Sequence, residues 1–141
     1  MPRLGLFVVA LAGLCAAVGA TATHALARSE TRAANVEHGQ YIVEHVAMCI
    51  ECHSPRDDNG RIIAGQEFTG GPIPIPVPPP DWATRAPRNR GLLGYDDDQA
   101  MRLLTQGAIG RNGERLRPPM PRFHMSHEDA ADVIAFLRSL H

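Results

Sequence analysis

Two cysteines and a histidine form one short motif in the segment AMCIECHSP. Cys49 and Cys52 are three positions apart, and His53 follows directly. On one turn of helix, residues i and i+3 project from the same face, so both thiols can reach one edge of a porphyrin and form thioether bonds there. The next histidine then lies under the ring and ligates the iron. The motif predicts one covalently attached c-type haem, with Cys49 and Cys52 as attachment sites and His53 as the proximal ligand.

Three other chemistries use closely spaced cysteines, and none of them accounts for the whole motif. A zinc half-site needs a second pair of ligands, but the only other cysteine is Cys15, in the apolar N-terminal run. A thioredoxin-like dithiol needs a βαβ context, and no strand pattern surrounds the motif. A disulfide between Cys49 and Cys52 would be strained and would give His53 no role. Haem attachment gives each of the three residues a role.

The N-terminal segment has the three parts of an export signal. Arg3 supplies positive charge, an uncharged apolar run extends from Leu4 to Ala20, and the ALA segment that ends at Ala27 is a small-x-small cleavage site. We therefore expect residues 1–27 to be a cleaved signal peptide and residues 28–141 to form a periplasmic domain, since this kind of haem is attached outside the cytoplasm. The alternative is a retained membrane anchor, for which the run is near the lower length limit.

Length, charge and composition narrow the class of protein further. The chain has 141 residues, which suits one domain. Its formal net charge is -1, so it lacks the basic footprint of a nucleic-acid-binding protein. Aromatic residues make up only 5% of the chain, so side chains alone supply a modest core. A bound cofactor would add to the apolar surface that the fold buries, and the single motif predicts one haem per chain.

Three main helices are predicted from the spacing of apolar residues. The first runs from about Val36 to Ala47. Its apolar face consists of Gly39, Ile42, Val43 and Val46. The second has Asp96 as its N-cap, with Gln99 completing a capping box, and stops at Gly107.

The last helix has the clearest pattern. Ser126 is its N-cap, and Asp129 completes the box three residues later. Its apolar stripe consists of Ala130, Val133, Ile134 and Leu137, widened by Phe136 and Leu140.

A long proline-rich loop separates the first two helices. GGPIPIPVPPPDW, from Gly70 to Trp82, alternates proline with apolar residues, which favours an extended polyproline conformation. We expect this loop to wrap over the haem edge, because apolar residues such as Ile73, Ile75 and Val77 would otherwise be exposed. The alternative is an exposed ligand for a partner domain.

The second axial position of the iron separates classes of function. A methionine or histidine there favours electron transfer, whereas an open position permits small-ligand binding or peroxide chemistry. The segment RPPMPRFHM holds Met120 between Pro119 and Pro121, which lower the entropy lost when the loop is fixed. We predict Met120 as the distal ligand and Met125 as a hydrophobic staple at the start of the last helix.

Other residues are weaker candidates for this position. Met48 adjoins the motif on the proximal side, and Met101 lies beside the buried stripe of the middle helix. Histidines outside the motif are interpreted as surface residues, and His45 and His124 are the two among them to consider as iron ligands. An open distal site also remains as an alternative.

From about His38 onward, the chain resembles a class I c-type cytochrome. HGQYIVEHVAMCIECHSPRD resembles the first helix and haem-binding turn of this family, GLLGYDDDQAMRLLTQG its middle helix, and RPPMPRFHMSHEDAADVIAFLRSL its ligand loop and last helix. The resemblance implies an all-α cytochrome c fold, with three main helices around one covalent haem and a long proline-rich loop. It also implies Cys49 and Cys52 as thioether sites, and His53 and Met120 as the proximal and distal ligands of the iron.

The resemblance further implies that Gly39 and Tyr41 meet the last helix near Phe136. It is strongest to cytochromes that accept electrons from periplasmic dehydrogenases. We therefore expect a periplasmic electron carrier, or the electron-accepting subunit of an oxidoreductase complex, that is not itself an enzyme. Its donor would be a periplasmic dehydrogenase and its acceptor a cytochrome or terminal oxidase of the respiratory chain, and it would meet a membrane only through a retained N-terminal segment. The alternative is a haem peroxidase or small-ligand sensor with an open distal site and His124 as an acid–base group.

Overall fold

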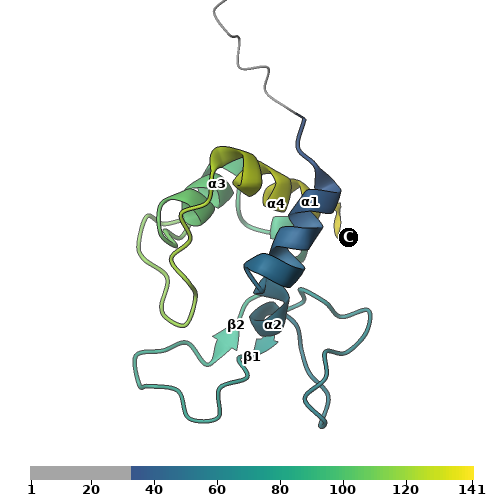
Figure 1. Cartoon of the computed structure of the whole chain (residues 1–141). Coiled ribbons are helices and arrows are strands. Elements are labelled where there is room, and N and C mark those ends of the chain that lie inside the picture. Colours follow the sequence, from purple (N-terminus) through teal and green to yellow (C-terminus); the bar gives the residue numbers. More distant parts are fainter. Residues whose placement is uncertain (1–32) are drawn as a thin grey trace, which may run out of the picture. The chain divides into compact units, whose positions relative to one another are not determined.

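Helices make up most of the regular structure in residues 33–141, the part of the chain that the computed structural model describes. The elements, in chain order, are α1 (Val36–Tyr41), the π-helix η1 (Ile42–Val46), α2 (Cys49–His53), β1 (Gly71–Pro72), β2 (Arg85–Ala86), the 3-10 helix η2 (Arg90–Leu92), α3 (Asp97–Thr105) and α4 (His127–Ser139) (Figure 1). None of these described helices is long and apolar enough to cross a bilayer. The predicted signal peptide, residues 1–27, lies outside the described residues. The expected all-α fold is correct for the helices but omits β1 and β2, which pair as a short antiparallel ladder.

The first predicted helix is present but changes its winding half-way. α1 begins after the N-cap Asn35, whose side chain accepts a hydrogen bond from the backbone of the first turn. It continues as η1, where the Ala47 N–H donates to the carbonyl of Ile42, five residues earlier. A π-turn holds one residue more than an α-turn, so the residues beyond it rotate around the axis. For this reason Val46, expected in the buried stripe with Ile42 and Val43, is instead 61% exposed.

Helices α1 and α4 cross at a glycine. A Cβ atom added at Gly39 would lie 2.0 Å from the carbonyl oxygen of Asp132 and 3.0 Å from the Cβ atom of Phe136. The two backbones therefore approach as closely as only glycine permits, and the expected contact of Gly39 with the last helix is confirmed. Tyr41, expected at the same contact, is instead 56% exposed. Two positions along a helix correspond to roughly 200° of rotation, which places Tyr41 on the opposite side of α1.

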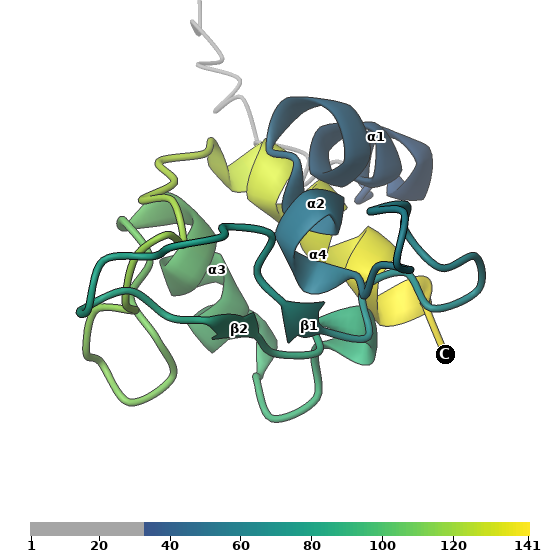
Figure 2. The same cartoon turned by 90° about the horizontal axis from the view of Figure 1, so that it is seen from below.

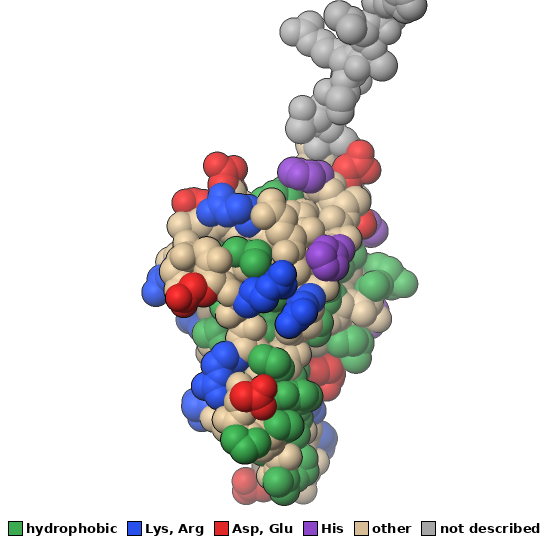
Figure 3. Space-filling view, turned by 90° about the vertical axis from the view of Figure 1, so that its left-hand side faces the viewer, with side chains coloured by type: hydrophobic (Ala, Val, Ile, Leu, Met, Phe, Trp, Pro, Cys, Tyr) green, Lys and Arg blue, Asp and Glu red, His purple; other side chains and the backbone are tan. Residues whose placement is uncertain are grey.

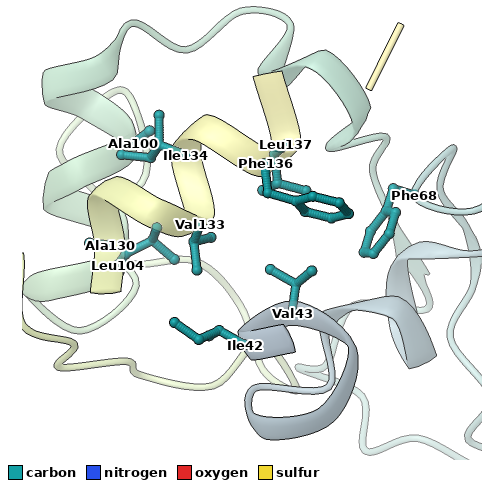
Figure 4. Packing of buried hydrophobic residues seen from close by; sticks show 10 residues of the cluster. All are labelled: Ile42, Val43, Phe68, Ala100, Leu104, Ala130, Val133, Ile134, Phe136 and Leu137. Atoms are coloured by element: carbon teal, nitrogen blue, oxygen red, sulfur yellow. The ribbon is translucent and has the colours of Figure 1, made fainter. Parts of the chain in front are cut away.

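Helix α4 carries the centre of the hydrophobic core (Figure 4). The predicted apolar stripe of α4 is buried, and so are the residues of α3 and of the first helix that face it. Together they form one buried cluster, which consists of Ile42, Val43, Phe68, Ala100, Leu104, Ala130, Val133, Ile134, Phe136 and Leu137. The predicted N-caps are confirmed: Asp96 and Gln99 form a reciprocal capping box, and the Ser126 side chain accepts from the Asp129 N–H. The box predicted for Ser126 is only half formed, because the Asp129 side chain makes no return hydrogen bond to the Ser126 N–H. These caps fix where α3 and α4 begin and therefore which faces they bury.

Arg138, near the end of α4, holds the segment that leads into α3. Its guanidinium donates to the carbonyl oxygens of Gly91, Leu92 and Tyr95. It also pairs with the Asp97 carboxylate at 3.0 Å. One side chain thus binds three backbone carbonyls of a connection that has little regular structure.

The proline-rich loop leaves and returns at the β1–β2 ladder, where Gly71 pairs with Ala86. Figure 2 shows the excursion between the two strands running beside the loop that precedes α4. Ile73 and Ala83, at its base, line the cavity described below. At its tip Val77 is 86% exposed, and hydrophobic side chains gather on the lower part of the face in Figure 3. The expectation that the loop shields its apolar residues is therefore correct at its base and wrong at its tip.

Candidate functional site

Helix α2 directs the C-x-x-C-H residues toward one cavity. Before it, Met48 adopts the left-handed region with φ 53° and ψ 32°, which ends the π-helix and lets a new helix start in another direction. Residues 49–53 then form the one-turn helix that the spacing predicts. Cys49, Cys52 and His53 all contribute to the lining of this cavity.

His53 is held in a defined orientation and protonation state. Its side chain is buried, and the ring Nδ1 lies 2.8 Å from the backbone carbonyl oxygen of Pro87. Because a carbonyl only accepts, Nδ1 carries the proton, and Nε2 keeps a lone pair for a metal. Burial lowers the pKa of His53, against an opposing effect of the Pro87 hydrogen bond. The imidazole is therefore neutral at neutral pH, as a metal ligand must be.

The cavity beside these residues has a volume of about 400 Å³, within the range of roughly 300–1,000 Å³ that is usual for cofactor sites. Its walls come from α2, the β2 segment, α3, the loop before α4 and α4 itself. Leu104, Val133 and Leu137 belong both to this lining and to the hydrophobic core. The residues present fit a covalent haem: apolar walls suit the ring, two thiols lie at one side, and an imidazole nitrogen is free to bind iron.

The two thiols are free and protonated. Burial raises the pKa of the Cys49 thiol to about 11, and it also raises the pKa of the Cys52 thiol. Neither is therefore a stable thiolate at neutral pH, whereas a reactive dithiol needs a lowered thiol pKa. The raised thiol pKa values argue against a reactive dithiol.

Met120 lies in the same cavity lining as His53, although 67 positions separate them along the chain. Met125 and Met101 instead pack against the hydrophobic core, and the Met125 N–H donates to the carbonyl of Leu104. Met48 also borders the cavity but adjoins Cys49 on the proximal side, as its place in the sequence predicts. Among the predicted distal candidates, the fold thus brings Met120 and not Met125 to the site.

The two alternative histidine ligands lie elsewhere. The His45 side chain is 64% exposed beside Glu44 on the outer side of η1. His124 is exposed, and its ring lies against Gly107 at the end of α3. The cavity lining among the described residues includes neither of them.

One contribution to the site carries no signal in the sequence. Pro87 acts through its backbone carbonyl, a group that every residue has, so its role follows only from the fold. Asn89 lines the cavity, and its buried Oδ1 has no hydrogen-bond partner among the described residues. Arg85 and Arg88 also line the cavity and add positive charge to its rim.

These features define a helical domain with a site for one covalently bound haem. The family model for cytochrome c matches residues 36–141, from the first helix to the end of the chain. The chain therefore belongs to the cytochrome c family, and it binds haem c covalently for electron transfer. Members of this family are typically electron carriers rather than enzymes. A comparison with curated proteins finds no significant match.

Proposed function

We propose that this protein is a periplasmic electron carrier whose single haem c has His53 and Met120 as axial ligands. One observation carries the proposal: a histidine of α2 and a methionine of the loop before α4 line one apolar cavity, together with the two motif cysteines. When bound, the haem iron supplies a one-electron ferric–ferrous couple.

His53 contributes a fixed, neutral nitrogen ligand. The carbonyl of Pro87 accepts its Nδ1 proton, which sets the tautomer and the direction of Nε2. A ligand held in this way would need little rearrangement when the charge on the iron changes. Small rearrangement is what an electron carrier requires of its ligands.

Met120 would contribute a soft, uncharged sulfur as the second ligand. A thioether stabilises the ferrous form and raises the reduction potential. The apolar lining, which includes Leu103, Leu104 and Val133, excludes water and favours the less charged state of the site. A position filled by Met120 would leave no open coordination site for peroxide chemistry, and the exposed His124 lies outside the cavity lining formed by the described residues.

The location and partners extend the same proposal. The predicted signal peptide, residues 1–27, supports export, and haem attachment outside the cytoplasm agrees with it. The resemblance to dehydrogenase-linked cytochromes supports a periplasmic dehydrogenase as donor and a cytochrome or terminal oxidase as acceptor. Substrate oxidation then belongs to the donor, and this chain accepts and delivers single electrons.

The distal ligand is tested by two matched substitutions. Methionine bound to ferric haem gives a weak far-red charge-transfer band in the oxidised protein. We expect Met120→Ala to abolish this band and Met125→Ala to leave it, with circular dichroism showing that both variants are folded. The reverse result would show that Met125 is the ligand. A wild-type protein without the band, with a high-spin spectrum and rapid carbon monoxide binding, would favour the sensor or peroxidase alternative.

A further inference from the structure

The loop that carries Met120 is fixed at both ends. Upstream, the Leu116 N–H donates to the carbonyl of Ala108 at 2.9 Å. Downstream, the carbonyl of Phe123 accepts from the Gly107 N–H at 2.9 Å. Between these anchors, every hydrogen bond that residues 117–122 make with other described residues reaches across to the proline-rich loop. Residues 117–122 therefore depend on the proline-rich loop for all of their hydrogen bonds to other described residues.

A single guanidinium makes most of this contact. Arg117 donates from Nε to the carbonyl of Asp81 at 2.8 Å, and from Nη2 to the carbonyls of Trp82 at 2.9 Å and Pro80 at 3.4 Å. These three consecutive carbonyls converge because residues 79–82 form a turn, closed by the Trp82 N–H and the carbonyl of Pro79 at 3.0 Å. The rigid fork of a guanidinium suits such a set of acceptors, whereas a lysine ammonium reaches them only as a point charge.

The contact lies close to Met120 along a stiff stretch of chain. Only Pro118 and Pro119 separate Arg117 from Met120, and proline fixes φ at about −65°. The carbonyl of Pro118 also accepts from the Ala83 N–H at 2.6 Å. Because little backbone freedom lies between them, fixing Arg117 also restricts where Met120 can go, and both residues line the cavity.

We propose that Arg117 is a positioning residue that clamps the proline-rich loop to the methionine loop and so controls how easily an external ligand displaces Met120. The inference rests on the proposed role of Met120 as distal ligand. Opening of the distal side separates the two loops and must break the Arg117 hydrogen bonds. Loss of Arg117 therefore increases the open population without changing Met120 or the proximal ligand.

The test is an imidazole titration of the oxidised, haem-loaded full chain, followed by its absorption spectrum. Imidazole binds iron only where Met120 has left, so its apparent affinity reports the open population. The Arg117 bonds are exposed, and we expect Arg117→Ala to raise this affinity about tenfold, equivalent to about 1.4 kcal/mol. Arg117→Lys keeps the charge but not the fork, and should lie between Arg117→Ala and the wild type.

Arg122→Ala is the matched control. Arg122 is exposed, lies two positions after Met120 and makes no hydrogen bond to any other described residue. Its loss removes the same charge from the same loop, and the imidazole affinity should stay within about twofold of the wild type. Equal affinities for Arg117→Ala and the wild type, or an equal rise in Arg122→Ala, would overturn the proposed clamp.

Met120→Ala, titrated in parallel, separates this inference from the proposed function. If that variant binds imidazole no better than the wild type, Met120 is not the ligand and both proposals fall. If it binds imidazole more tightly while Arg117→Ala does not, only the clamp is refuted. Should Arg117→Ala fold poorly, the comparison of Arg117→Lys with Arg122→Lys decides the question by the same criterion.

Discussion

The crossing of α1 and α4 gives the sharpest prediction about stability, because it depends on one absent methyl group. Gly39→Ala places a Cβ atom 2.0 Å from the carbonyl oxygen of Asp132, and the contact is with backbone, which cannot rotate away. Real Cβ contacts are essentially never shorter than 3.0 Å. The substitution therefore forces the two helices apart by roughly 1 Å at their closest point.

The size of the effect follows from what is buried there. Ile42, Val43, Val133 and Phe136 are buried in the core between or beside the two helices, and each burial is worth about 1.5–3 kcal/mol. A gap of roughly 0.5–1 Å forfeits about a quarter to a half of the dispersion energy of facing atoms. The loss is then about 2–4 kcal/mol. Alanine's higher helix propensity returns about 1 kcal/mol, so the free energy of unfolding should fall by about 2 kcal/mol.

Urea denaturation of the haem-loaded chain, followed by far-ultraviolet circular dichroism, measures this change. Gln40→Ala is the control, because Gln40 is exposed on the same helix and its substitution should change the free energy of unfolding by less than about 0.5 kcal/mol. Propensity alone predicts that Gly39→Ala stabilises the protein by about 1 kcal/mol. A stabilised Gly39→Ala variant would refute the close crossing.

Two further predictions concern other parts of the chain. Arg138→Ala should lower the free energy of unfolding by about 2 kcal/mol, because it leaves the carbonyls of Gly91 and Tyr95 without their donor and leaves Leu92 with only the Tyr95 N–H. Urea denaturation measures this, and an unchanged midpoint would contradict it. Mass spectrometry of the exported protein should give a chain that begins at Arg28, whereas the mass of the full sequence would show that the apolar segment is retained.

The parts of the fold that local chemistry decides were predictable from the sequence. The capping box of Asp96 and Gln99 and the cap of Ser126 each involve residues three apart, so one short segment holds both partners. The stripe of α4 is buried as its period predicts. The same reasoning predicts the one-turn helix of residues 49–53, because thioether chemistry fixes the spacing of its cysteines.

The remaining features depend on contacts between distant segments, which leave no local pattern. The π-turn of η1 rotates Val46 to the surface, although its spacing alone places it in the apolar stripe. The β1 strand consists of Gly71 and Pro72, two residue types with low strand propensity. The clamp on the distal loop joins Arg117 to backbone carbonyls 35 to 37 positions earlier. Solvated arginines and clamping arginines look alike in a sequence, and only the fold distinguishes them.

The cavity and the core share a wall, and this explains why so short a motif constrains so much of the fold. Leu104, Val133 and Leu137 pack into the core on one side and line the cavity on the other. A covalent haem in the cavity removes the cavity-lining surfaces of these side chains from water. Full burial of such a side chain is worth about 1.5–3 kcal/mol. A chain with few aromatic residues thereby completes its core with its cofactor. The thioether bonds keep the haem on the chain when it unfolds, so its effect on stability comes from the ring burial and iron ligation that only the folded state provides. A ring attached at residues 49–53 must be surrounded by α3, α4 and the loop that carries Met120. The motif therefore determines where these elements lie in space, although it does not determine how far along the chain they follow.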